Sequence, residues 1–223
     1  CTDMYRPHHL DHHGQTWGKA DPDLPLAVGF PVSKASMARK VLRDLSGITG
    51  IKQLIGTSMF LYGAIRDDSS AVGVTDPTRL SVLPMRPNRQ RAIKLLVGTL
   101  VTNALLLAVL FALGQPALYL LWLGAWLTTH KLIVRVRSMA EHAKVPDPHP
   151  DRPLGNTRTT LTSFWERLLF APHGVGYHLE HHLVITVPHY KLARFHRLLK
   201  ERGALDDACI AHGYAEVLRQ MVT

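Results

Sequence analysis

Two long apolar runs stand out from an otherwise mixed chain. The first covers residues 95–113, carries no charge, and has only two threonines and one asparagine as clearly polar members. At about 1.5 Å per helical residue it would reach roughly 28 Å, close to the hydrocarbon thickness of a bilayer. A Gly-Gln-Pro break follows at 114–116, and the second apolar run covers 117–134. The pattern predicts two transmembrane helices joined as a hairpin.

The distribution of positive charge supports a membrane hairpin. Basic residues lie at its two ends and none lies at its tip: Arg86, Arg89, Arg91 and Lys94 on one side, Lys131, Arg135 and Arg137 on the other. By the positive-inside rule both ends are expected on the cytoplasmic side, with a short loop outside. The alternative is a buried helical hairpin of a soluble α-protein.

The remaining segments give weaker patterns. Within residues 31–65, Ser33 or Ser36 is expected to cap a helix that glycines interrupt at 47–50. The apolar stretch 48–65 fits an interfacial helix, a re-entrant segment or a tilted span. Residues 66–92 and 144–163 are polar or proline-containing and are expected to be connectors. From His189 onward, apolar and basic residues alternate at helical spacing, which is typical of a surface helix or of one lying on a membrane.

Composition narrows the class of protein. The chain has 223 residues, which suits one domain covering 1–223. It is 46% hydrophobic and 19% charged, so it is neither disordered nor collagen-like. Cys1 and Cys209 form no metal-binding pair or disulfide framework. The net charge of +9 suits an anionic membrane or a nucleic acid. No nucleic-acid-binding signature is present, so no nucleic acid partner is expected.

The histidines are the candidate functional residues of the chain. The pattern HxxHH occurs twice among 14 histidines, as His9, His12 and His13, and as His178, His181 and His182. On a helix, positions i, i+3 and i+4 share one face, so each box presents three imidazoles to one place. Chance predicts roughly 0.05 such boxes in a chain of this composition. The sequence therefore predicts a metal site.

Six imidazoles exceed the ligand set of one zinc ion and indicate a centre with two metals. His142, near the end of the second apolar run, is a seventh candidate ligand, or else an interfacial histidine. Asp11 and Glu180 lie inside the boxes, where their carboxylates are placed to orient imidazoles. The alternative is that both are solvated helix residues.

Two HxxHH boxes flanking a membrane hairpin resemble the membrane fatty acid desaturases, of the histidine-box, non-haem di-iron superfamily. The matching stretches are YRPHHLDHHGQTWGKADPDL at 5–24, RVRSMAEHA at 135–143 and FAPHGVGYHLEHHLVITVPHY at 170–190. The resemblance implies an all-α membrane protein whose cytoplasmic helical cap holds two irons. It also implies O₂-dependent oxidation of a lipid acyl chain.

By this resemblance, the ligands are the seven histidines His9, His12, His13, His142, His178, His181 and His182. Oxidation of an unactivated CH₂ needs a redox-active metal, which favours iron over zinc. The expected partners are the bilayer, an acyl lipid or acyl thioester, and an electron donor such as ferredoxin or cytochrome b5. The expected location is a bacterial inner membrane, with the boxes on the cytoplasmic side.

The sequence departs from the family pattern in two places. The family's first box, HxxxH or HxxxxH, is missing, which suggests a chain truncated at its N-terminus and inactive alone. Gly174 stands where many relatives have Asn. The histidine boxes would also serve a hydroxylase or ketolase acting on a fatty acid, sphingoid base or carotenoid. A non-catalytic metal-binding membrane protein is the alternative from another class.

Overall fold

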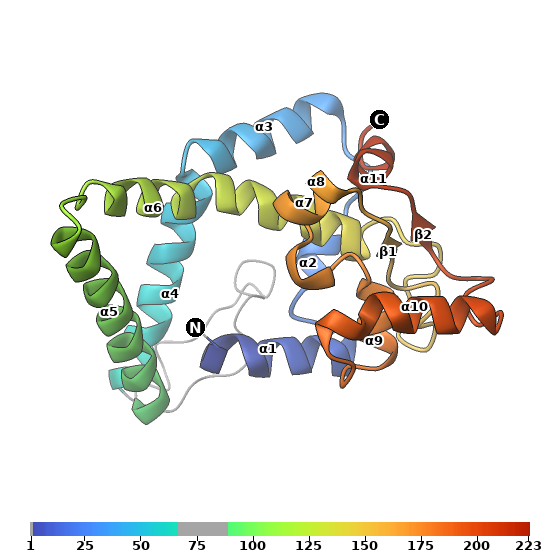
Figure 1. The fold of residues 1–223 in the computed structure, drawn as a ribbon, viewed down its shortest axis with the longest axis horizontal. Coiled ribbons are helices and arrows are strands. Elements are labelled where there is room, and N and C mark those ends of the chain that lie inside the picture. Colours follow the sequence, from blue (N-terminus) through green and yellow to red (C-terminus); the bar gives the residue numbers. More distant parts are fainter. Residues whose placement is uncertain (1, 67–88) are drawn as a thin grey trace. The chain divides into compact units, whose positions relative to one another are not determined.

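The computed structural model describes residues 2–66 and 89–223, which fall into two compact units (Figure 1). Among the described residues, the first unit contains 2–11, 40–66 and 89–132, and the second contains 12–39 and 133–223. Most of the predicted connector 66–92 lies outside the described residues.

The chain is mostly helical, as predicted. Seven helices precede residue 143: α1 (Thr2–Gln15), α2 (Leu24–Ala27), α3 (Lys34–Leu45), α4 (Ile48–Arg66), α5 (Arg89–Ala112), α6 (Leu118–Leu127) and α7 (Thr129–His142) among the described residues. Shorter elements follow: β1 (Thr159–Thr160), α8 (Phe164–Leu169), the 3₁₀ turn η1 (Pro172–Gly174), α9 (His178–Leu183), the 3₁₀ turn η2 (His189–Lys191), α10 (Leu192–Glu201), β2 (Ile210–Ala211) and α11 (Tyr214–Gln220). The two strands pair in parallel, with Thr159 opposite Ile210.

The first unit is built from α4, α5 and α6, which are neighbours in Figure 1. Gly50 lets α4 approach α6 closely, because a Cβ atom there would lie 2.7 Å from the Leu127 Cα atom. Within α5, Ala92–Ala112 is long and apolar enough to cross a membrane, and no other described helix is. Its side chains are largely uncovered, as Phe111 at 73% exposure illustrates. This agrees with the first predicted span, 95–113.

The second predicted span, 117–134, is divided between two helices. α6 ends at Leu127 and α7 begins at Thr129, because Thr128 leaves helical geometry at φ −117° and ψ −89°. The Thr128 amide still donates to the Gly124 carbonyl at 3.1 Å, and the Thr128 hydroxyl donates to the same carbonyl at 2.6 Å. With 10 residues, α6 is about 15 Å long, half of a hydrocarbon core. That this stretch crosses a membrane stays a prediction, as does the cytoplasmic cap.

The helix predicted within 31–65 is present, and so is its interruption. Ser33 accepts a hydrogen bond from the Ser36 amide at 3.2 Å at the start of α3. Gly47, with φ +81°, separates α3 from α4 in a backbone conformation that favours glycine. The structure therefore confirms the helix and its interruption, and residues 48–66 form a second helix, α4. Whether α4 spans or lies on a membrane stays a prediction.

A buried arginine organises the second unit. Arg158, 2% exposed, precedes β1 and directs its guanidinium at the end of α7. It donates to four carbonyls at 2.9–3.3 Å, those of Met139, Ala140, Ala143 and Lys144. A helix terminus leaves its last carbonyls without helical partners, and the guanidinium supplies donors in this region. The Met139 carbonyl also accepts the Ala143 amide at 3.1 Å. Arg158 thus fixes the turn of α7 that carries His142.

The basic helix predicted after His189 is α10, and its apolar side chains are only partly covered, since Leu198 is exposed. Leu192 and His196 are buried, whereas Arg194 and Arg197 are exposed. The structure confirms the helix, and whether it lies on a membrane or is an ordinary surface helix stays a prediction.

Candidate metal centre

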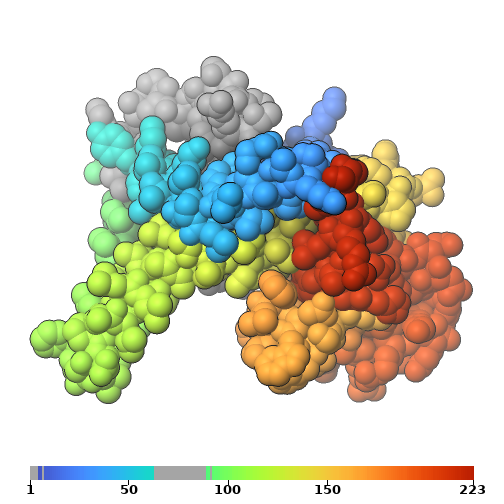
Figure 2. Space-filling model, turned by 90° about the horizontal axis from the view of Figure 1, so that it is seen from above, coloured from blue at the N-terminus to red at the C-terminus, as the bar shows by residue number. Residues whose placement is uncertain are grey.

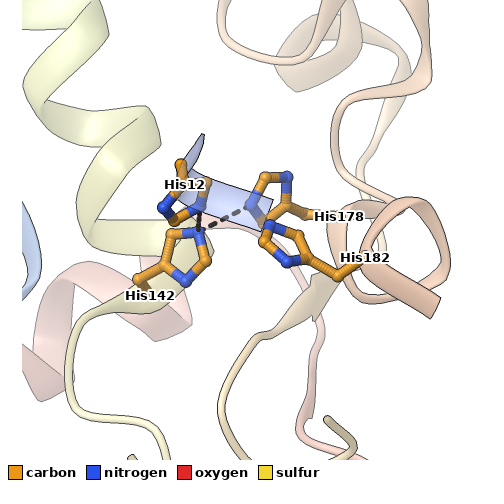
Figure 3. A group of neighbouring side chains, drawn as sticks. All are labelled: His12, His142, His178 and His182. Carbon is orange, nitrogen blue, oxygen red and sulfur yellow. Dashed lines mark hydrogen bonds between the residues drawn. The ribbon is translucent and has the colours of Figure 1, made fainter. Parts of the chain in front are cut away.

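Four histidines from three helices converge in the second unit. His12 comes from α1, His142 from the end of α7, and His178 and His182 from α9 (Figure 3). One ring nitrogen of each lies within 4.8 Å of those of the others. The Nε2 atom of His142 is 3.0 Å from that of His12 and 2.8 Å from that of His178. Imidazole nitrogens at this spacing suit a shared transition-metal ion.

Burial keeps most of these imidazoles neutral, which is the form that binds metal. Burial, reinforced by the neighbouring His12, lowers the pKa of His142 to about 3. Burial and the adjacent imidazoles also lower the pKa of His178 and His182 well below the usual range.

An unpartnered nitrogen supports the assignment. The Nε2 atom of His182 is buried and has no hydrogen-bond partner among the described residues. Leaving a buried polar atom unpaired is costly. A cation bound by the four imidazoles would give this lone pair a partner, so the residues present fit a metal ion.

A second pair of histidines adjoins the first group. His13 and His181 face each other with their Nε2 atoms 3.0 Å apart. The ring of His13 also stacks on that of His182, with centroids 4.0 Å apart. Six of the seven predicted ligands therefore lie together in the second unit. His9 lies one turn before His13 on α1, in the first unit.

Glu180 supports α9 in a way the sequence did not indicate. Its carboxylate is fully buried and accepts hydrogen bonds from Thr159 Oγ1 at 2.6 Å and from His196 Nδ1 at 2.5 Å. Its partners are thus a strand and a surface helix, not the imidazoles of its own box. The network ties α9 to β1 and to α10 from the side facing away from the four-histidine group.

The carboxylate that does orient a box imidazole is Asp21, which the sequence analysis missed. It accepts a hydrogen bond from His12 Nδ1 at 2.7 Å. Asp21 is itself held by the backbone amides of Trp17 and Asp23, each at 2.8 Å. The hydrogen bond and charge of Asp21 outweigh burial and raise the pKa of His12. Asp11, the predicted residue, is half-exposed in the first unit.

The comparison with protein families identifies the chain. The family model described as "Fatty acid desaturase" matches residues 1–214. The chain belongs to the fatty acid desaturase family. The match contains all seven predicted ligands, and it confirms the resemblance drawn from the histidine boxes. A search of curated proteins finds no significant match.

Proposed function

We propose that this protein carries out O₂-dependent desaturation of a fatty acyl chain at two histidine-ligated irons. Family membership supports an oxidoreductase of the desaturase and hydroxylase type. The observation that carries the proposal is the convergence of four imidazoles from α1, α7 and α9, three of them buried and that of His182 half-buried. They provide nitrogen ligands for a transition metal, and burial favours the neutral form of three of them.

The proposed ligands divide into two sets. His12, His142, His178 and His182 would hold one iron, and His13 and His181 would contribute to the other. His9 stays a predicted ligand from its place in the first histidine box. Bound iron would supply the O₂-activating redox chemistry that attack on an unactivated CH₂ requires. The protein's own part is to keep the imidazoles neutral by burial and to fix their orientation. Asp21 does this for His12 by holding the Nδ1 proton.

The proposed partners follow from the reaction. The acyl substrate, as a lipid or a thioester, reaches the centre from the bilayer, and a separate carrier such as ferredoxin or cytochrome b5 delivers electrons. The exposed apolar surface of α5 supports an integral membrane protein. We place the histidines on the cytoplasmic side from the flanking positive charges, and we propose a bacterial inner membrane as the location.

The test is lipid profiling by mass spectrometry of cells that express the full-length gene. A product lighter by two hydrogen atoms is expected, and it should disappear in His181→Ala. His212→Ala is the matched control, because this histidine is exposed and outside the predicted ligands. Equal membrane levels of the three proteins would show that the loss is chemical.

Other products would assign another outcome. A lipid heavier by one oxygen would indicate a hydroxylase, and replacement of two hydrogens by oxygen would indicate a ketolase. If supplied ferredoxin and cytochrome b5 produce no new lipid, while purified protein still binds iron, the non-catalytic alternative would be correct. Wild-type turnover in His181→Ala would contradict the ligand assignment.

A further inference from the structure

Helix α8 in the second unit exposes its large apolar side chains. The four side chains are those of Phe164 (67%), Trp165 (67%), Leu168 (61%) and Leu169 (55%). In Figure 2 the segment around α8, drawn in orange, stands out from the surface. Isolated apolar residues are normal on a surface, but four in one short helix mark an interaction site.

Of the two charged residues of α8, Glu166 is the one that bonds to the rest of the protein. Ser163 and Glu166 form a reciprocal capping box at the start of the helix. The Glu166 carboxylate also accepts the Tyr214 amide of α11 at 2.7 Å. Gly213 makes room for this contact, since a Cβ atom there would lie 2.9 Å from Glu166 Oε1. These bonds fix the rotation of α8, so its apolar side cannot turn inward without breaking them.

We propose that α8 inserts into the interface of a phospholipid bilayer and docks the second unit there. Phenylalanine, tryptophan and leucine next to a basic residue are the composition of interfacial helices, and Arg167 is exposed beside them. Its positive charge complements anionic headgroups. The chain also carries α5, whose length and exposed apolar surface fit a bilayer.

The size of the patch favours lipid over a second protein. Four side chains of this kind expose on the order of 500 Å², below the roughly 800 Å² per partner of a stable protein interface. A bilayer imposes no such minimum, because each inserted side chain leaves water independently.

Docking at α8 would also position α9, the helix with three of the proposed metal ligands, and this consequence rests on the proposed function. α8 leads through η1 directly into α9, which carries His178, His181 and His182. Anchoring α8 would hold α9 at the depth where acyl chains enter the interface. The docking itself requires no catalysis.

Nitroxide labels can measure this insertion. Leu168→Cys and, separately, Trp165→Cys would be labelled in a Cys1→Ser, Cys209→Ser background of the full chain. The control is Ala215→Cys, an exposed position on α11 in the same unit. Each protein would be placed in vesicles of neutral and anionic phospholipid. Power saturation would then compare collisions with O₂, which concentrates in lipid, and with a water-soluble nickel chelate.

We expect both α8 labels to collide several-fold more with O₂ than with the nickel chelate, and the control label to show the reverse. Nickel-dominated collisions at both α8 positions would overturn the proposal. Weak collisions with both reagents would overturn it too, because protein would then cover the helix. A spin–spin interaction between position-168 labels on two copies, lost when the protein is diluted with lipid, would show that a second copy covers the helix. None of these readouts depends on turnover, so a failed desaturase assay would leave them interpretable.

Discussion

At the scale of single residues, metal binding depends on which nitrogen of each imidazole carries the proton. His12 donates from Nδ1 to Asp21, which leaves the Nε2 lone pair directed at His142. A carboxylate behind a ligand fixes its tautomer and raises its basicity. Asp21 is 7% exposed and is held by two backbone amides, so it can keep this position when the metal is absent.

Replacing Asp21 with alanine should weaken metal binding by about 10- to 100-fold, the usual effect of losing such a partner. Competition with a chromophoric chelator would measure the dissociation constant. Asp23→Ala is the matched control, since the Asp23 carboxylate is 3.9 Å from His12 Nδ1 and 26% exposed. If both variants bind metal like the wild type, Asp21 has no part in orienting His12.

The buried imidazoles should make the metal-free protein sensitive to acid. Burial lowers the pKa of His142 from 6.5 to about 3, and that of His178 and His182 falls in the same direction. At pH values between about 3 and 6.5, the unfolded chain therefore binds more protons at His142 than the folded chain does. The free energy of unfolding should therefore fall as pH falls below 6.5, by up to about 1.4 kcal/mol per pH unit for each such histidine.

His12 opposes this trend above pH 6.5, because its raised pKa makes the folded state bind more protons there. Burial raises the pKa of Glu141, which acts in the same sense above pH 4.5. Burial also lowers the pKa of His181, so four imidazoles with a lowered pKa still predict a net loss of stability. Chemical unfolding of metal-stripped protein in detergent between pH 7.5 and pH 5 would measure it. His149→Ala, a change at a 61% exposed side chain, should leave the slope unchanged. Unfolding free energies that stay constant or rise on acidification would show that the cluster is not buried as described.

At the scale of elements, the position of His142 depends on the end of α7. Arg158 satisfies four carbonyls there, and its positive charge complements the negative end of the helix. Its backbone amide also donates to the Glu141 carbonyl at 3.0 Å. The terminus of α7 is therefore defined by a residue from the following connector.

Arg158→Met should lower the free energy of unfolding by about 3 kcal/mol or more, because buried carbonyls would lose their partners. It should weaken metal binding as well, since His142 is on the same turn. Thermal unfolding followed by circular dichroism and a metal titration would measure the two effects. Arg152→Met is the control, at a 70% exposed arginine that pairs with Asp147. Equal behaviour of the two variants would rule out the capping role.

Features with a local cause could be predicted from the sequence. Helix α5, the break at Gly47 and the two histidine boxes each follow from residues that are close together in the chain. Thr128 gave no such signal, because the apolar run continues through it and α4 packs beside it through Gly50. Asp21 was missed for the same reason, since only the fold of the following loop brings it back to His12. The outward face of α8 likewise depends on Glu166 bonding to a distant helix.

At the scale of the whole molecule, a metal would join segments that are far apart in sequence. His12 and His142 are 130 residues apart in the sequence, and His142 and His178 are 36 residues apart. Cross-links that close long loops remove conformational entropy from the unfolded chain, so they stabilise the folded one. Helix α5 makes its backbone hydrogen bonds within itself and contributes no ligand to this group.

Removal of the metal should therefore loosen the second unit selectively. After chelation, amide hydrogen exchange should rise in residues 12–23, at the end of α7 and in α9, where the ligands are located. Exchange in α5 should stay unchanged in the same sample, because its protection comes from its own helical hydrogen bonds and the surrounding lipid or detergent. Readdition of iron should restore the original protection, and magnesium, which prefers oxygen ligands, should not. A uniform rise that includes α5 would mean that chelation unfolds the protein globally, and no rise in α9 would mean that its histidines hold no metal.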